Sequence, residues 1–371
     1  MKYYIIAGEA SGDLHGSNLI KQIHLQDSNA NIHCWGGDLM ESAGASVVKH
    51  YKELAFMGFS EVLKNLPTIL KNISFCKKDI EAFQPDVLVL IDYPGFNLRI
   101  ASWAKAKGFK VVYYISPTVW AWKENRVKMM KQCIDQMIVI LPFEKDWYAK
   151  KWQWNVAYAG HPLVNVIDNF QSSAKAFSDQ PIVAVLPGSR KQEISVKLPV
   201  MLKVAASFPG YQFIVAKAPA IDDSFYEPFL QPYKNVAVVK GKTYDVLKQA
   251  TAAIVTSGTA TLETALFGVP EVVCYKGNNL SFQIAKRLVN VKYISLVNLI
   301  MDKPVVRELI QHDMTSQLIT AELKKILEDE DYNREMKNNL AQLHDLLWGD
   351  GNPSESAAKM VVNTARGASV S

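Results

Sequence analysis

The sequence lacks the features that mark several classes of protein. It has only four cysteines, far apart, with no Cys-x-x-Cys pair and no Cys/His grouping at zinc spacing, so we expect reduced core thiols and no metal site. No apolar run approaches the roughly 18 residues of a membrane span, and Glu9 interrupts the N-terminal stretch 3–7 before a signal-peptide core forms. These absences predict a protein of the cytosol or of the cytosolic face of a membrane.

Neither sign of charge dominates the chain. Lys and Arg outnumber Asp and Glu by 41 to 36, and a net charge of +5 suits an anionic substrate or an acidic membrane surface. It is too small to indicate a nucleic-acid partner. With 49% apolar and 21% charged residues, the 371-residue chain is neither disordered nor fibrous, and its length indicates two domains.

Short apolar, β-branched runs alternate with longer segments of helical periodicity, which is the pattern of βαβ units in parallel sheets. The predicted strands are 3–7, 32–35, 87–91, 111–115, 137–141 and 156–158 in the first half, and 182–186, 212–215, 236–239, 253–256 and 272–275 in the second. The fold class is therefore α/β, with two doubly wound domains.

Composition also suggests where the domains end. The polar stretch 168–180 is expected to link an N-terminal domain, 1–167, to a C-terminal domain, 181–348. A Gly-Asp-Gly-Asn-Pro break then precedes a last amphipathic helix. We expect the tail 349–371 to dock back on the N-terminal domain or on a second subunit, which leaves a homodimer open.

In a doubly wound sheet, ligands bind beyond the carboxyl ends of the strands, so the loops there are the candidate site. After the first strand, Gly8, Glu9, Ser11, Gly12 and Asp13 form a small-residue loop that leads into a helix. The third glycine of a dinucleotide fingerprint is missing, and by itself this loop is equally well a tight turn.

Two loops of the second half are suited to an anion. One comprises Gly188, Ser189 and Arg190, and the other comprises Ser257, Gly258, Thr259, Ala260 and Thr261. Each precedes a helix, whose free N–H groups favour negative charge, and the arginine adds a bidentate cation, so together they predict a diphosphate site. The alternative is two capped helix starts beside a surface arginine.

Single residues near these loops have two interpretations each. Glu263 is placed to accept both hydroxyls of a ribose or to complete a capping box. Asp92, at the end of the strand 87–91, suits a general base or a helix cap. In the loop from Ser116, Trp120 suits a sugar or acyl chain or the core. His161 ends the last strand of the first half, where a lone histidine is more often structural.

One segment is amphipathic. Its apolar side chains recur at helical spacing, with lysines nearby: Phe59, Val62, Leu63, Leu66, Ile69, Leu70 and Ile73. Such a stripe, which extends to 56–75 with its flanking residues, packs against the protein's own sheet or lies in a membrane interface. The sequence leaves both open, and core packing is the commoner case.

Together these motifs closely resemble those of the lipid-A-disaccharide synthases, a family of inverting glycosyltransferases. The resemblance covers nearly the whole chain and rests on the segments 8–13, 53–58, 91–97, 116–122, 141–145, 160–162, 186–190, 257–263 and 295–299. It implies the type B glycosyltransferase fold, in which two doubly wound domains face a cleft and the second holds the nucleotide. Among substrate-binding residues, it adds Asn97 and Asn298 from these segments.

The resemblance also implies a reaction. A 2,3-diacylglucosamine would pass from UDP-diacylglucosamine to the 6-hydroxyl of diacylglucosamine 1-phosphate, giving a β-1,6 disaccharide and UDP without a cofactor. Asp92 matches the family's essential aspartate and Arg190 its essential arginine, whereas Gly95 stands where some members have a second aspartate. Glu9 and Asp13 remain alternative bases.

Acylated substrates reside in a bilayer, so the resemblance favours peripheral association with the cytosolic face of the inner membrane. It leaves the acyl-chain lengths open. Two other functions fit the same fold. A UDP-N-acetylglucosamine 2-epimerase would share the nucleotide loops, and a two-domain sugar-binding protein would carry out no catalysis.

Overall fold

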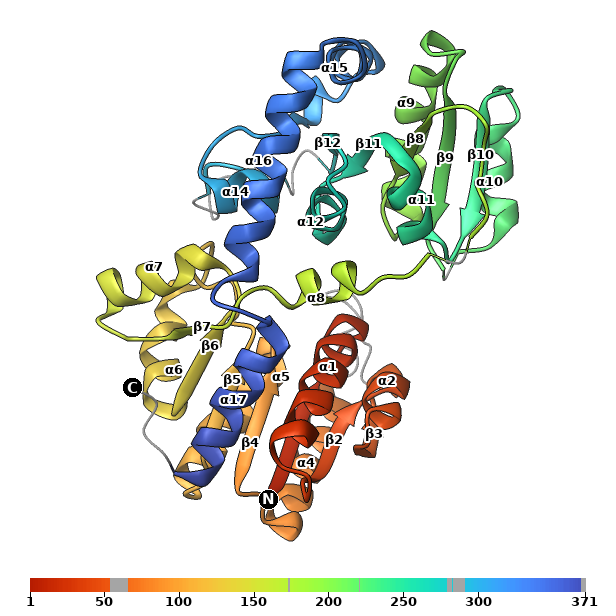
Figure 1. Cartoon of the computed structure of the whole chain (residues 1–371). Helices are drawn as coiled ribbons and strands as arrows, with labels where there is room; N and C mark the ends of the chain where they lie inside the picture. The colour runs from red at the N-terminus through yellow and green to blue at the C-terminus, as the bar shows by residue number, and fades with distance from the viewer. Residues whose placement is uncertain (54–65, 173, 220, 279–281, 283–290, 368–371) are drawn as a thin grey trace. The chain divides into compact units, whose positions relative to one another are not determined.

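The computed structural model (Figure 1) describes residues 1–53, 66–172, 174–219, 221–278, 282 and 291–367. Contacts between residues divide the chain into two compact units. The first comprises 1–165 together with 347–371, and the second comprises 166–346. The expected linker 168–180 therefore has its contacts in the second unit.

The first unit contains a sheet of seven parallel strands in the order β3-β2-β1-β4-β5-β6-β7. The strands are β1 (Lys2–Ala7), β2 (Asn31–Gly36), β3 (Ser46–His50), β4 (Val87–Ile91), β5 (Val111–Tyr114), β6 (Gln136–Val139) and β7 (Ala157–Tyr158). The central strands are buried on both faces, which explains why β4 is apolar at every position.

Helices cover both faces of this sheet. They are α1 (Ala10–Gln26), α2 (Asp38–Ser42), α4 (Leu66–Phe83), α5 (Pro94–Ala106), α6 (Val127–Cys133), α7 (Pro142–Trp152) and α17 (Pro353–Arg366). Short 3-10 turns lie at Tyr51–Glu53 and Glu124–Arg126. Side chains of α4, α5 and α6 form one core with Tyr4, Leu88 and Tyr113 of the strands. The helix α8 (Pro162–Asp168) leads from the first unit into the second.

The second unit contains six parallel strands in the order β10-β9-β8-β11-β12-β13. They are β8 (Ile182–Leu186), β9 (Gln212–Lys217), β10 (Val236–Lys240), β11 (Ala250–Thr256), β12 (Glu271–Tyr275) and β13 (Arg307–Ile310). The helices are α9 (Lys191–Leu202), α10 (Asp223–Leu230), α11 (Thr243–Gln249), α12 (Thr259–Leu266), α14 (Leu296–Met301), α15 (Ser316–Glu328) and α16 (Glu330–Trp348), with 3-10 turns at Lys203–Ser207 and Gln311–Asp313. The predicted α/β class with two doubly wound sheets is confirmed.

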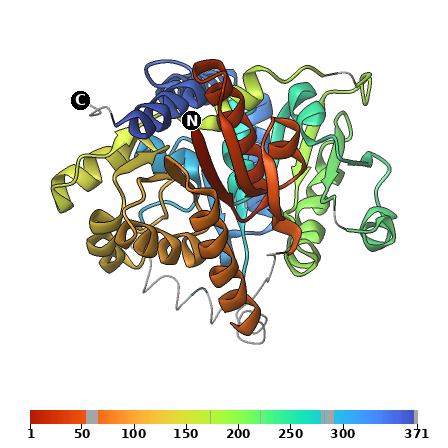
Figure 2. The same cartoon turned by 90° about the horizontal axis from the view of Figure 1, so that it is seen from below.

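The last helix of the chain belongs to the first unit. α17 packs along α1, and the two helices lie side by side in both views (Figures 1 and 2). Asn352 caps α17 by accepting hydrogen bonds from the N–H groups of Ser354 and Glu355, both at 3.1 Å. At the other end, Lys110 Nζ donates to the Ala365 carbonyl at 3.0 Å. The tail thus covers the α1 face of the first sheet.

Candidate active site

The turn after β4 holds Asp92 in a strained conformation. Asp92 and Tyr93 have φ angles of 44° and 46°, in the left-handed region, which costs a non-glycine residue about 1–3 kcal/mol. Two side chains fasten this turn: the Tyr113 hydroxyl donates to the Asp92 carbonyl at 2.5 Å, and Asn97 Nδ2 donates to it at 2.8 Å. Backbone strain maintained by such contacts is typical of functional sites.

The carboxyl group of Asp92 has an unusual affinity for protons. Burial and, to a smaller extent, the nearby charge of Glu9 raise its pKa to about 6, although a hydrogen bond from the Tyr93 N–H acts weakly in the opposite direction. The residue is only partly buried, so another molecule can reach it. A carboxylate that titrates near neutral pH can accept a proton from an alcohol far better than an ordinary aspartate.

The loop after β1 contributes less chemistry than its residue types suggest. Glu9 and Ser11 are exposed, but Gly8 and Gly12 are buried, and a Cβ atom at Gly8 would lie 2.4 Å from the Tyr93 ring. Asp13 is buried and accepts hydrogen bonds from three main-chain N–H groups, those of Gly37, Leu39 and Met40. Asp13 therefore caps α2.

The loop after β5 is held by a residue that the sequence analysis did not single out, Glu144. Trp120 Nε1 donates to Glu144 Oε1 at 3.0 Å, and the Leu141 N–H donates to Oε2 at 3.1 Å. Burial raises the pKa of Glu144 to about 8. The hydroxyl of Ser116 shares a 2.8 Å hydrogen bond with the Tyr148 hydroxyl, so Ser116 also fixes the loop. The Glu144 side chain accepts from the N–H of the N-cap residue Leu141, which is one half of a capping box; without a Ser or Thr at position 141, the sequence gives no signal for it.

Two residues expected to bind substrate instead have structural partners. The side chain of Asn97 is fully buried against main-chain carbonyls. His161 is buried, its ring Nδ1 accepts from the Leu163 N–H at 3.2 Å, and its main-chain N–H donates to the Leu347 carbonyl at 2.7 Å. Burial and the neighbouring His15 lower the pKa of His161 to about 3, so it stays neutral and anchors the returning chain.

A cavity of about 330 Å³ lies at the carboxyl ends of β8, β9 and β11 in the second unit. Its walls include most of the residues expected to hold a nucleotide: Gly188, Ser189, Ser257, Gly258, Thr259, Ala260 and Glu263. Gly188 and Gly258 have φ angles of 112° and 151°, which residues with a side chain rarely adopt, so these loops require glycine. α12 begins at Thr259 and directs its first N–H groups to this end.

The charged residues of this region are held by neighbours. Arg190 is 70% exposed, and its Nη1 lies 3.3 Å from Glu193 Oε1, a carboxylate that lines the cavity. The Tyr244 hydroxyl donates to Glu263 Oε1 at 2.7 Å and orients that carboxylate. Burial raises the pKa of Glu263. Such an oriented acceptor at a cavity wall can bind sugar hydroxyls.

Two other expected binding residues of the second unit are buried within it. Thr261 has no exposed surface, and its hydroxyl donates to the Gly258 carbonyl at 2.9 Å, which stabilises the start of α12. Asn298 exchanges hydrogen bonds with the main chain of Val306 and donates to Glu308 Oε1 at 3.0 Å. Asn298 thus fastens α14 to the strand β13, and neither side chain is presented to a ligand.

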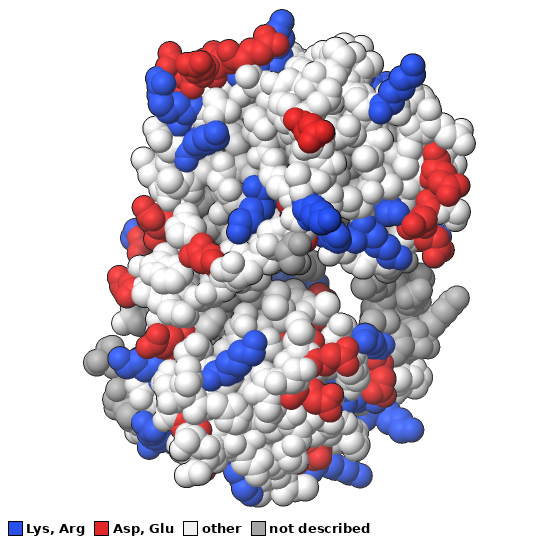
Figure 3. Space-filling model, turned by 45° about the vertical axis from the view of Figure 1, so that its right-hand side comes forward, with Lys and Arg blue, Asp and Glu red and all other residues white. Residues whose placement is uncertain are grey.

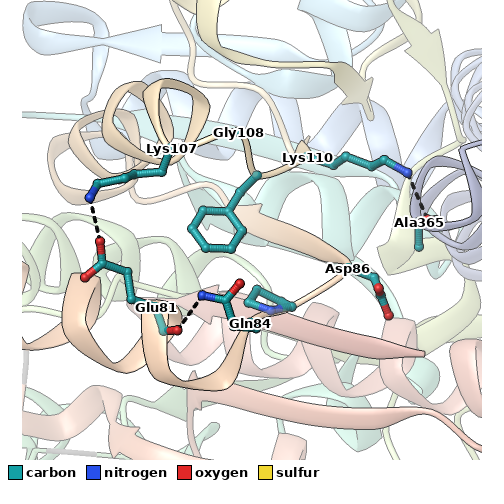
Figure 4. A pocket seen from close by; sticks show the side chains of 9 residues that line it. Glu81, Gln84, Asp86, Lys107, Gly108, Lys110 and Ala365 are labelled. Atoms are coloured by element: carbon teal, nitrogen blue, oxygen red, sulfur yellow. Dashed lines mark hydrogen bonds and ion pairs between the residues drawn. The ribbon is translucent and has the colours of Figure 1, made fainter.

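A second cavity, of about 600 Å³, lies in the first unit at the amino ends of β4 and β5, the end of the sheet opposite to Asp92 (Figure 4). Its lysines are already engaged: Lys107 Nζ lies 2.9 Å from Glu81 Oε1, and Lys110 binds the Ala365 carbonyl. Since the amino ends of parallel strands are not where such folds bind ligands, this cavity is not the candidate site.

The surface charge is mixed, and the described helices and side chains offer neither a membrane span nor a metal site. On the face shown in Figure 3, Lys and Arg side chains are interspersed with Asp and Glu and separated by uncharged areas. Within the part of the chain that the structure describes, no helix has the length and apolarity to cross a membrane, and no three His, Cys, Asp or Glu residues are grouped to hold a metal ion.

Known proteins resemble this chain in fold and, more specifically, in sequence. The solved structure of UDP-GlcNAc 2-epimerase from Neisseria meningitidis bound to UDP-GlcNAc has a TM-score of 0.69 and covers 99% of this chain and 100% of its own, at 12% identity. That likeness shows the fold alone, and it does not favour the epimerase alternative.

Sequence similarity is more specific. The lipid-A-disaccharide synthase of Trichlorobacter lovleyi is 38% identical over 94% of this chain and 93% of its own, and that of Geobacter metallireducens is 39% identical over 96% of both. The profile of the lipid-A-disaccharide synthetase family matches residues 3–360. The chain therefore belongs to the lipid-A-disaccharide synthetase family, and it is a glycosyltransferase that uses a UDP-sugar donor.

Proposed function

We propose that Asp92 is the general base of this glycosyltransferase and that the cavity of the second unit holds the UDP of its donor. The reaction is the transfer of 2,3-diacylglucosamine from its UDP derivative to the 6-hydroxyl of 2,3-diacylglucosamine 1-phosphate. The observation that carries the assignment is a partly buried carboxylate at the carboxyl end of β4, with its pKa raised to about 6 and its main chain fixed by two side chains.

The chemistry is a single in-line displacement. Asp92 takes the proton of the acceptor hydroxyl while the hydroxyl oxygen bonds to the anomeric carbon of the donor. The bond from that carbon to the diphosphate breaks, and UDP leaves with the electron pair. Because the carboxylate is partly removed from water and lies near the charge of Glu9, accepting the proton relieves an unfavourable charge.

Groups around the cavity of the second unit stabilise the departing diphosphate. The main-chain N–H groups at the start of α12 and the loop at Gly188 provide donors, and Arg190 provides a bidentate cation. For the latter role Arg190 exchanges its ion pair with Glu193 for the diphosphate. Glu263, oriented by Tyr244, accepts the ribose hydroxyls.

The test is the dependence of UDP release on the acceptor. With both lipid substrates, we expect UDP and disaccharide in equal amounts. With the donor alone, we expect UDP release at only a small fraction of that rate. Acceptor-independent release of UDP together with an epimerised sugar would contradict the transfer reaction.

We also propose that the enzyme meets its acylated substrates at the cytosolic face of the inner membrane. Much of the amphipathic stripe, including Phe59, Val62 and Leu63, lies outside the described residues. In α4, Ile69 and Ile73 pack on the core, whereas Leu70 and Phe75 are 52% and 47% exposed. Exposed apolar side chains beside lysines suit an anionic lipid surface, and they support this proposal.

A further inference from the structure

Lys217 is a buried lysine to which the mechanism above gives no role. It is the last residue of β9, and its side chain is only 6% exposed. Lysine is almost never so fully buried unless its charge is paired. The carboxyl end of a central strand is also where this fold places its ligand contacts. Lys217 lies among the residues that line the 330 Å³ cavity of the second unit.

The partner of Lys217 does not explain its burial. Lys217 Nζ lies 2.7 Å from Asp223 Oδ1, at the first turn of α10, and this ion pair lowers the pKa of Asp223. Asp223 is 65% exposed, so water can solvate its carboxylate without help from the lysine. An ion pair with one exposed member contributes little to stability. The ion pair therefore gives no structural reason for burying Lys217.

The charges of the cavity indicate what Lys217 could bind. Among the described residues that line it, Lys217 is the one cation, and Glu193 and Glu263 are carboxylates. A nucleoside diphosphate would bring further negative charge close to both. Arg190 is not among the lining residues and is largely exposed, so its charge is better screened by solvent than that of a buried lysine.

A second polar group at the same wall lacks a partner. Thr256 is the last residue of β11 and lines the cavity, and its buried Oγ1 has no hydrogen-bond partner within the described structure. Buried hydroxyl groups are rarely left unsatisfied in folded proteins. The unsatisfied hydroxyl ends β11 and the buried cation ends β9, on either side of β8, and both line the same cavity, so together they point to a polar ligand there.

From this arrangement we infer that Lys217 leaves Asp223 and binds the diphosphate of the UDP donor and of the UDP product. The inference rests on the proposed function, in which UDP occupies this cavity. Asp223 then acts as a competitor that holds the ammonium group while the cavity is empty. Because negative charge on the diphosphate grows as the glycosidic bond breaks, the contact would assist turnover as well as binding.

The experiment compares two variants that remove opposite members of the ion pair, Lys217→Met and Asp223→Asn. Dissociation constants for UDP, UMP and uridine are measured by calorimetry on the full chain. For Lys217→Met we expect UDP to bind about 10-fold or more weakly, UMP less affected and uridine unchanged. For Asp223→Asn we expect UDP to bind as in the wild type or more tightly, because its competitor is gone.

A purely structural pair gives a different pattern. Both variants would then lower the melting temperature together and leave the UDP dissociation constant unchanged, which would overturn the inference. If Lys217→Met does not fold, the variants Lys217→Arg and Asp223→Asn test the inference instead. Weaker UDP binding by Asp223→Asn than by the wild type would contradict a competition between Asp223 and the diphosphate for Lys217. Failure of the wild type to bind UDP would instead refute the proposed nucleotide site, so the two failures are distinguishable.

Discussion

At the residue scale, the turn after β4 has features that lower the stability of the protein and that suit Asp92 to catalysis. Asp92 has a left-handed backbone, and its carboxyl group is held where burial and Glu9 disfavour the charged form. Its pKa in the folded state, about 6, lies above its ordinary value of 3.8. Folding therefore favours the protonated form, and the protein loses stability as the pH rises from about 4 to about 6.

Replacing Asp92 by Asn should therefore raise thermal stability while it removes activity. Above pH 6 the wild type contains a buried negative charge that the variant lacks, so Asp92→Asn should melt at a higher temperature at pH 8. The difference in melting temperature between Asp92→Asn and the wild type should vanish near pH 4, where Asp92 of the folded protein is protonated. Melting curves across this range measure it, and a variant equally destabilised at both pH values would show that the carboxylate is not strained.

Glu144 permits a similar test at a residue with no proposed contact to substrate. Its folded pKa of about 8 lies above the ordinary 4.5, so its burial costs the wild type stability as the pH rises from about 4.5 to about 8. Glu144→Gln should remove that pH-dependent loss of stability between pH 6 and 8. Its one carbonyl oxygen can accept from Trp120 Nε1 but not also from the Leu141 N–H, so we expect a cost in stability that does not vary with pH. Glu144→Ala leaves the indole N–H of Trp120 unsatisfied and should cost about 1–3 kcal/mol of unfolding free energy near pH 4.5, and less as the pH rises, because the variant also lacks the buried carboxylate.

At the scale of helices and strands, the sequence predicted the central strands but missed both β3 and β13. These two lie at sheet edges, and their sequences, Ser-Val-Val-Lys-His and Arg-Glu-Leu-Ile, contain too few apolar residues to stand out. An edge strand has one neighbour, so it needs less apolar surface than a central one. The pattern of residue types therefore predicted each sheet without one of its two edge strands.

The same limit applies to the site. The loops that line the cavity were predictable because glycine and small residues before a helix have a direct physical meaning. Asp13, Asn97 and Asn298 are also polar residues near strand ends, but each binds main-chain groups brought close by tertiary packing. Sequence alone cannot distinguish such a fastening residue from a ligand contact. Lys217 was missed for the converse reason, since a lysine ending an apolar strand resembles an ordinary surface charge.

The two faces of α4 should respond differently to substitution. Leu70→Ser with Phe75→Ser removes exposed apolar groups, so it should release the protein from anionic vesicles with little change in melting temperature. Ile73→Ala opens a cavity in the core and should cost about 2–5 kcal/mol. Vesicle sedimentation and thermal melting measure the two effects. Unchanged vesicle binding by the double variant would place the membrane contact elsewhere.

At the scale of the whole molecule, the first unit is built from both ends of the chain. Residues 347–371 return to it, and α17 covers α1 and the strands behind it. The cavity proposed to hold UDP, in contrast, is lined by residues between 186 and 263 in the second unit. Ligand and tail should therefore stabilise different parts of the protein.

Deleting residues 349–371 should expose the apolar face of α1 and destabilise the first unit while UDP still binds to the second. Saturating UDP, at about 100 times its dissociation constant, should stabilise the second unit by roughly 2.7 kcal/mol in both proteins. Hydrogen exchange resolved by segment measures the two units separately. Loss of UDP binding on deletion of the tail would show that the cavity depends on the first unit.

The most direct test of the account is the pH dependence of turnover in the wild type and in Asp92→Asn, measured with both lipid substrates and alongside the UDP dissociation constant. We predict that wild-type kcat/KM falls below a pH of about 6, as Asp92 is protonated, and is constant above it. Asp92→Asn should turn over roughly 100-fold more slowly, without that titration, and bind UDP as the wild type does. A variant that keeps more than about a tenth of the wild-type rate and the same pH profile would contradict Asp92 as the base.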